Sequence, residues 1–197
     1  MTTKYEQISS SLFVKNRKKF TEKMQPKSLA ILNSNDIYPV SSDSTLPFAQ
    51  HRDIFYLSGV DQEESILLIF PDAYKEEHRE ILFLRETNEH IAIWEGEKLT
   101  KEKATEVSGV KSVFWLSDFD RIFYNLMNEA VNIYLNKNEH YRAVLEVQTR
   151  EDRFIERVKK EFPLHEILRS NPILQHLRSV KEPEEIALMQ KACDITE

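Results

Sequence analysis

Histidine and cysteine side chains are the first candidates for chemistry in this chain. The six histidines are His51, His78, His90, His140, His165 and His176. A zinc-protease helix needs two histidines at positions i and i+4, and no two of the six have that spacing. The single cysteine, Cys193, has no second thiol to pair with and no histidine close in sequence to activate it. We therefore predict no metal site here, and interpret the histidines as surface or half-buried residues.

Nucleophile and phosphate-binding motifs are also missing from the sequence. Ser58-Gly59 lacks the preceding glycine of a Gly-x-Ser-x-Gly nucleophile elbow. The three glycines of the chain, which are Gly59, Gly96 and Gly109, are too few and too far apart to form a glycine-rich phosphate loop. The acid pairs Glu63-Glu64 and Glu76-Glu77 have no spacing that marks a general acid and base. The sequence thus predicts no catalytic residue.

Two stretches are less ordinary. Residues 41 to 59 form a long polar segment before an apolar run, and such loops often carry function. The alternative interpretation is that Asp43 and Asp53 cap turns while Phe48 fills the core. Trp94 stands beside a glycine turn in Ile-Trp-Glu-Gly, and is either a core anchor, which the pattern alone favours, or an outward contact residue.

Composition narrows the class of protein. The 197 residues carry a formal net charge of −6 and are 41% hydrophobic, which is typical of a folded domain. An acidic balance without a basic stripe argues against nucleic-acid binding. The N-terminus resembles no signal peptide, and the longest strongly apolar run, residues 66 to 70, is too short to span a membrane. We therefore expect a cytoplasmic protein.

Hydrophobic periodicity predicts an α/β fold in which helices cover a mixed sheet. The predicted strands are residues 29–32, 54–57, 65–70, 80–84, 90–94, 113–116, 131–135 and 164–168. The predicted helical segments are residues 10–24, 100–108 ending at Gly109, one capped by Ser117 with its stripe over 119–126, one over 154–162, and a turn at 171–176. The segment from Ile37 to Gln50 is predicted to be irregular.

The C-terminal segment resembles the start of a further helix. Pro183 and the acids around it favour a helix N-terminus, and Ile186, Met189 and Cys193 mark an apolar face. A helix of this length is marginal without a surface to pack on. We therefore expect the natural protein to continue, with a domain over 1–176, a linker over 177–182 and the first helix of the next domain over 183–197.

Five separated motifs carry a family resemblance. They are Met24-Gln25-Pro26, Asp43 to Gly59 in the pattern Asp-x-x-x-Pro-Phe-x-Gln-x-x-Asp-x-Phe-Tyr-Leu-x-Gly, Glu64-Ser65, Ile93-Trp94-x-Gly96, and Leu177-Arg178-x-x-Lys181-x-Pro183-x-Glu185-Ile186. In this order they resemble the N-terminal domain of the Xaa-Pro aminopeptidase (aminopeptidase P) branch of the creatinase, prolidase and methionine aminopeptidase superfamily. The last motif is shared across the superfamily, and the second is more specific to the branch.

The resemblance implies a ribonuclease H-like motif in the N-terminal domain, followed by a separate metallopeptidase domain. That second domain carries two divalent metal ions, usually manganese, which activate water for attack on the bond before proline. None of its metal ligands matches this chain, so the resemblance implies no cofactor and no catalysis here. It implies instead contacts within a homo-oligomer, and substrate-gating roles for Trp94 and Asp43 towards peptides with proline in second position.

One departure from the family pattern and two alternatives remain. Ala49 stands where the family commonly has an arginine, so any role of that arginine is lost or moved. The first alternative is a non-catalytic peptide- or protein-binding module of the same fold. The second is a fragment of a prolidase-type dipeptidase or a creatinase, against which Trp94 and the pattern from Asp43 to Gly59 argue.

Overall fold

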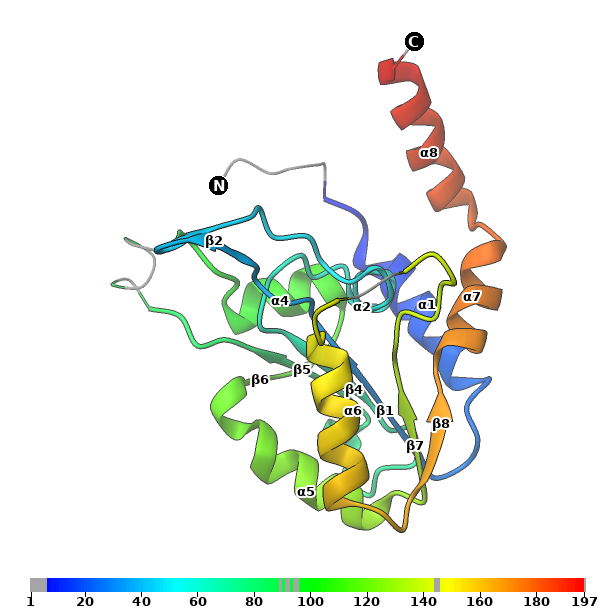
Figure 1. Ribbon diagram of the computed structural model, residues 1–197. Coiled ribbons are helices and arrows are strands. Elements are labelled where there is room, and N and C mark those ends of the chain that lie inside the picture. The colour runs from blue at the N-terminus through cyan, green and yellow to red at the C-terminus, as the bar shows by residue number, and fades with distance from the viewer. Residues whose placement is uncertain (1–6, 89, 91–92, 94–95, 144–145, 197) are drawn as a thin grey trace.

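The computed structural model describes residues 7–88, 90, 93, 96–143 and 146–196, and these form a mixed sheet flanked by helices, as predicted (Figure 1). The strands in these ranges are β1 (Ser28–Asn33), β2 (Pro39–Ser41), β3 (Ser44–Thr45), β4 (Ile66–Ile69), β5 (Glu80–Leu84), β6 (Ser112–Trp115), β7 (Asn132–Leu135) and β8 (Glu166–Arg169). The α-helices are α1 (Ser10–Thr21), α2 (Arg52–Ser58), α4 (Lys101–Ser108), α5 (Phe119–Glu129), α6 (Arg150–Glu161), α7 (Asn171–Ser179) and α8 (Pro183–Thr196).

The main sheet has six strands in the order β6-β5-β4-β1-β7-β8. Strand β4 is antiparallel to both of its neighbours, whereas β1, β7 and β8 are parallel to one another, and so are β5 and β6. Parallel pairing requires a crossover, and helices α4 and α6 supply it between β5 and β6 and between β7 and β8, while α5 lies in the longer connection from β6 to β7. The carboxyl ends of β1, β7 and β8 therefore lie at one edge of the sheet.

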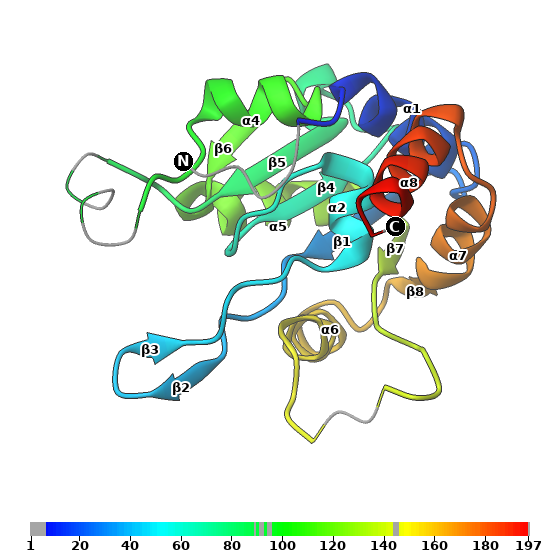
Figure 2. The same cartoon turned by 90° about the horizontal axis from the view of Figure 1, so that it is seen from above.

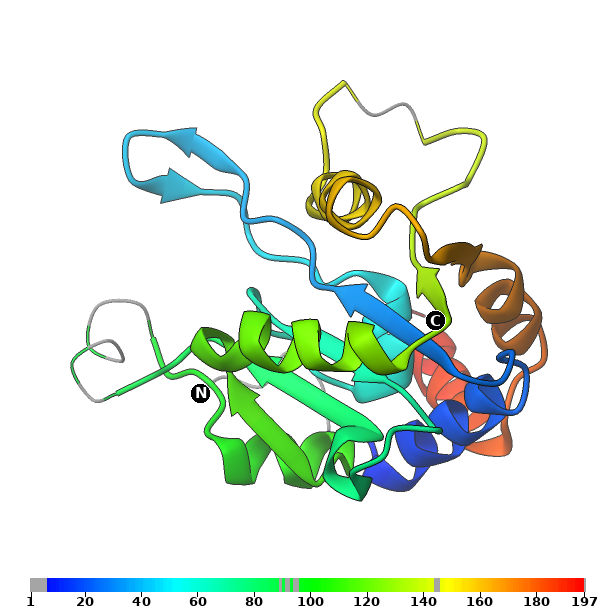
Figure 3. The ribbon, with the colours of Figure 1, turned by 90° about the horizontal axis from the view of Figure 1, so that it is seen from below.

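Both faces of the sheet are buried, because side chains that alternate along each strand enter two separate cores. Leu29 and Ile31 of β1 pack in a core with α5 and α6, and Figure 3 shows α5 crossing that face. Ala30 and Leu32 pack on the opposite face with α1, α2, α4 and α7. Burial on two sides explains why β1 is a continuous apolar run instead of an alternating one.

The segment predicted as a strand at residues 54–57 is helix α2, and that prediction was wrong. A short apolar run does not by itself distinguish a buried strand from a buried helix. The residues at the two ends of the segment distinguish a helix from a strand, since His51 caps the first turn and Gly59 ends the helix in the left-handed conformation at φ 68°. A Cβ atom added to Gly59 would lie 2.2 Å from the ring of Phe13 in α1, so the close approach of α1 also requires glycine.

Several other segments differ from the prediction. The stretch expected to be irregular contains the hairpin β2–β3, which projects away from the body of the domain (Figures 2 and 3). Ser117 lies in a 3-10 turn, and Asp118 is the residue before α5. Helix α7 continues to Ser179, well past the turn predicted at residues 171–176. The strand predicted at residues 90–94 falls largely outside the described residues.

A buried arginine joins three elements beneath the second face of the sheet. Arg17 of α1 has no exposed surface, and its Nη1 donates to the carbonyl oxygens of Leu57 at 2.7 Å and Ser108 at 2.9 Å. These carbonyls lie at the C-terminal ends of α2 and α4, where helical partners are lacking. The guanidinium also donates from Nε to Glu80 at 2.9 Å. Burial lowers the pKa of Arg17, which the neighbouring Glu80 carboxylate opposes.

Candidate functional site

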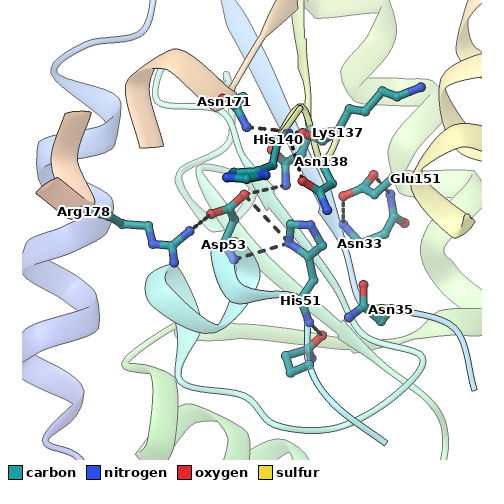
Figure 4. A network of polar contacts seen from close by, with 12 residues as sticks. Asn33, Asn35, His51, Asp53, Lys137, Asn138, His140, Glu151, Asn171 and Arg178 are labelled. Carbon is teal, nitrogen blue, oxygen red and sulfur yellow. Dashed lines mark hydrogen bonds and ion pairs between the residues drawn. The ribbon is translucent and has the colours of Figure 1, made fainter. Parts of the chain in front are cut away.

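A polar pocket of about 480 Å³ lies where the parallel strands end. Its wall includes Ser34 and Asn35 after β1, Asn138 after β7 and Asn171 after β8. The N-termini of α2 and α6 and the C-terminal half of α7 complete it. Open α/β sheets bind ligands at the carboxyl ends of their strands, where connections diverge to the two sides. The position of this pocket therefore marks it as the candidate site (Figure 4).

Asp53 is the centre of the polar contacts in this pocket. Its side chain is buried, and Oδ1 accepts from Arg178 Nη1 of α7 at 2.7 Å while Oδ2 accepts from Asn136 Nδ2 at 3.0 Å. Three distant parts of the chain, namely α2, the end of β7 and α7, thus meet at one carboxylate (Figure 4). Charge-assisted hydrogen bonds of this kind are stronger than neutral ones, so Asp53 holds the pocket wall together.

His51 lines the same pocket and caps α2. Its Nδ1 accepts the backbone N–H of Asp53 at 3.3 Å, which requires an unprotonated Nδ1 and places the proton of the neutral ring on Nε2. Burial lowers the pKa of His51 and favours this neutral form, against the raising effect of the Asp53 carboxylate. Because Nδ1 is an acceptor here, His51 and Asp53 do not form the donor arrangement of a catalytic triad.

Glu151, in the first turn of α6, forms a second buried carboxylate of the pocket. Its two oxygens accept from the backbone N–H of Asn33 at 3.0 Å and from Asn33 Nδ2 at 2.8 Å (Figure 4). Burial raises the pKa of Glu151 to about 8, although both hydrogen bonds act in the opposite direction. This pair joins the end of β1 to the start of α6.

Gln50 organises the loop that leads into α2. Its Nε2 donates to the carbonyl oxygen of Gln62 at 2.9 Å and to Val60 O at 3.1 Å, and its Oε1 accepts the backbone N–H of His51 at 2.8 Å. Nε2 also lies 3.2 Å from Ser65 Oγ. The glutamine and serine of two of the motifs noted above are thus in contact, and they hold His51 and Asp53 in place.

A second cavity, of about 560 Å³, lies between α6, the start of α5 and the strands β1 and β4. Arg153 and Arg157 of α6 line it, and their guanidinium groups pair with Asp36 at 2.5 Å and Asp120 at 2.8 Å respectively. Because these arginines are paired with aspartates, we interpret the cavity as a solvent-filled space between helices and strands. The pocket around Asp53 remains the candidate site.

The structure describes only one of the two residues predicted from the family resemblance. Asp43 is exposed in the turn of the β2–β3 hairpin, outside the set of residues that line the pocket. Trp94 lies outside the described residues. Their substrate-gating roles stay predictions. The structure brings together Asp53 and Arg178 instead, which sequence reasoning assigned to no site, although both stand in the quoted motifs.

The residues that line the pocket offer hydrogen-bond donors and acceptors. Within the described ranges, no group of three or more histidine, cysteine, aspartate and glutamate side chains is placed to hold a metal ion. The family resemblance implies two divalent ions in the separate domain that follows, and not in this pocket. The buried amides and carboxylates are suited to hydrogen bonding with a polar ligand or a polar protein segment. In the same ranges no helix is long and apolar enough to cross a membrane.

The architecture and the pocket define a mixed α/β domain with a polar site at the carboxyl edge of its sheet. The family model described as "Aminopeptidase P, N-terminal domain" matches residues 13–134. This is more than half of the chain, so the chain belongs to the aminopeptidase P N-terminal domain family.

Known proteins similar to this chain are enzymes of greater length. Xaa-Pro aminopeptidase of Escherichia coli K12 is 27% identical over 191 residues, which are 96% of this chain and 43% of that protein. Xaa-Pro aminopeptidase 3 of Homo sapiens is 24% identical over 168 residues, or 84% of this chain and 32% of that protein. The chain thus spans less than half the length of these relatives.

Solved structures show the same fold. The low-pH form of aminopeptidase P from E. coli superposes with a TM-score of 0.77 at 26% identity, covering 97% of this chain and 43% of that one. A structure from Bacillus anthracis superposes with a TM-score of 0.83 at 23% identity, covering 93% of this chain and 43% of that one. The latter likeness concerns the fold alone.

Proposed function

We propose that this chain is the accessory N-terminal domain of a manganese-dependent Xaa-Pro aminopeptidase, which removes the N-terminal residue preceding proline. The observation that carries the proposal is the alignment of 96% of this chain with only 43% of the E. coli enzyme. The proposed catalytic domain, with its two divalent metal ions, follows a linker at residues 177–182 and begins with helix α8. In this proposal the present chain supplies no metal ligand and no catalytic group.

The proposed role of the domain is to shape substrate access and to supply contacts in a homo-oligomer. Asp43 suits such a role because it lies at the tip of a projecting hairpin, and Val40 and Leu46 of this region are 59% and 55% exposed. Trp94 is also proposed to gate access for peptides with proline in second position. A cytoplasmic location is proposed for the whole protein, as the sequence analysis predicts.

A second candidate function is a non-catalytic peptide- or protein-binding module. The pocket around Asp53 favours it, because a preformed polar cavity without a metal-ligand cluster among the described residues is suited to binding alone. The downstream sequence discriminates the two candidates. Intact Asp, Asp, His, Glu and Glu metal ligands there would rule this alternative out.

The experiment that tests the proposed function is a peptidase assay with an Arg-Pro-Pro peptide and manganese. This chain and the full-length protein are assayed in parallel, with a peptide that lacks proline in second position as the control. We expect cleavage of the proline peptide by the full-length protein only. Cleavage by this chain would overturn the proposal, and cleavage by neither would favour the binding module.

Replacing Trp94 by alanine in the full-length protein tests the substrate-gating role. We expect a raised KM for the proline peptide with oligomeric state and thermal stability unchanged. Loss of folding would show instead that Trp94 is a core anchor.

A further inference from the structure

Helix α8 leaves the domain without packing against it. None of its described residues is buried, and its apolar side chains Ile186 and Met189 are 55% and 54% exposed. Figure 1 shows the helix projecting beyond α7. Because packing does not fix the direction of α8, the contacts at its first residues must do so.

At the start of α8, the side chain of Glu185 binds the backbone of Glu182, while the side chain of Glu182 does not cap the helix. Glu182 is the residue before the helix, and its carbonyl oxygen accepts the N–H of Ile186 at 3.0 Å. A residue in this position usually caps the helix with its own side chain. Here Glu185, three residues later, accepts the backbone N–H of Glu182 at 2.8 Å, which is one half of a capping box. The carboxylate of Glu182 is therefore left for other contacts.

That carboxylate pairs with α1. Lys15 Nζ contacts one oxygen of Glu182 and Lys19 Nζ contacts the other. The two lysines are four residues apart on one face of α1, so a single carboxylate reaches both. Its side chain is only 11% exposed, and the hydrogen bonds from both lysines hold the pKa of Glu182 below its ordinary value. We call Lys15, Lys19 and Glu182 the lysine cluster.

The helix before α8, α7, is itself anchored to the domain. Leu174 of α7 is buried at 1% exposure, and Arg178 in its last turn pairs with Asp53. Only Val180 and Lys181 lie between the end of α7 and Glu182. The start of α8 is thus tied to the domain on both sides of a two-residue connection.

We propose that Glu182 is a positioning residue, which through the lysine cluster sets the direction in which α8 and the chain after it leave the domain. In the enzyme proposed above, on which the functional meaning of this inference rests, the cluster sets the angle between the accessory domain and the catalytic domain. An isolated exposed ion pair contributes little. Two pairs on one largely buried carboxylate, at the start of a helix with no buried side chain among its described residues, constrain direction more than they contribute to the stability of the domain.

The test is a distance measurement between two spin labels by pulsed electron paramagnetic resonance. Cys193, the single cysteine, is exposed on α8 and takes one label, and Asn125→Cys on the exposed face of α5 takes the other. We expect one narrow distance distribution in the parent chain. Glu182→Gln is expected to broaden it by about twofold or more with the melting temperature nearly unchanged, since only the start of α8 is released.

Matched variants separate direction from general destabilisation. Glu184→Gln makes the same chemical change at a residue whose contact with Lys15 is 4.0 Å long, and we expect the parent distribution. Lys15→Gln combined with Lys19→Gln removes the same ion pairs from the side of α1 and should broaden the distances as Glu182→Gln does. A broad distribution in the parent chain, or an unchanged one in Glu182→Gln, would overturn the inference.

The outcomes separate this inference from the proposed function. If the full-length protein fails to cleave Xaa-Pro peptides while Glu182→Gln broadens the distances, only the proposed function fails. If it cleaves them and the distances do not change, only the positioning role of Glu182 fails.

Discussion

Replacing Asp53 by asparagine tests whether its carboxylate holds the candidate site together. The change keeps the shape of the side chain but leaves one acceptor oxygen where two are used. Either Arg178 or Asn136 then faces an amide N–H instead of an oxygen. A donor facing a donor in a buried site is unfavourable whichever way the amide turns.

The expected loss of folding free energy is about 2–4 kcal/mol. A hydrogen bond to a charged group contributes about 1.5–3 kcal/mol, and a buried group left without a partner costs about 1–3 kcal/mol. The side chain of Arg178 is 40% exposed and is rehydrated once released, which keeps the sum below the combined maximum. For a domain of this size about 2–4 °C accompany each kcal/mol, so the melting temperature should fall by about 4–16 °C.

Urea and thermal unfolding followed by circular dichroism measure the effect. Asp43→Asn is the matched control, because it makes the same change at an exposed turn of the β2–β3 hairpin. We expect that control to lie within about 0.5 kcal/mol of the parent. Equal effects at the two aspartates, or a loss below about 1 kcal/mol for Asp53→Asn, would refute the reasoning.

Four further variants have defined expectations. Gly59→Ala should lose more than about 2 kcal/mol in urea unfolding, since its Cβ meets Phe13, whereas Gly96→Ala, with nothing within 4 Å, should lose only about 1 kcal/mol. Arg17→Met should cost about 2–5 kcal/mol, because two buried carbonyls lose their donor; a cost near zero would contradict that account. The pKa of Glu151 is raised from its ordinary value of 4.5 to about 8 in the folded protein, so its stabilising contribution is complete below pH 4.5 and is lost as the pH rises through about 8. The free energy of unfolding should therefore fall over that pH interval, and Glu151→Gln should flatten this pH dependence.

Much of the fold was predictable because strands buried on both faces leave a clear signal. The apolar runs around Leu29 and Ile66 are continuous, and both are central strands. The helix ending at Gly109 was predicted for the physical reason that holds in the structure, a left-handed residue at φ 71°. Residues 54–57 show the limit of this method, since four apolar residues fit a buried strand and a buried helix equally well.

The candidate site was not predictable in the same way. Asp53 and Arg178 are 125 positions apart, and neither periodicity nor spacing relates them. From the sequence, Asp53 is predicted only as a turn cap or as part of the family motif, and no pattern marks Glu151. The motif from Asp43 to Gly59 did contain a signal, since Gln50, Asp53 and Gly59 all make the contacts that shape the pocket or its helix.

The sequence by itself determined the fold class, the course of the central strands and the family, because burial patterns and ordered motifs are local properties of the chain. Only the tertiary structure decided that α2 is a helix, that Asp53 meets Arg178, and that Glu182 pairs with two lysines of α1. The physical reason is distance along the chain. A cap or an apolar run acts within a few residues, whereas an ion pair forms between side chains that only the closed sheet and its helices bring together.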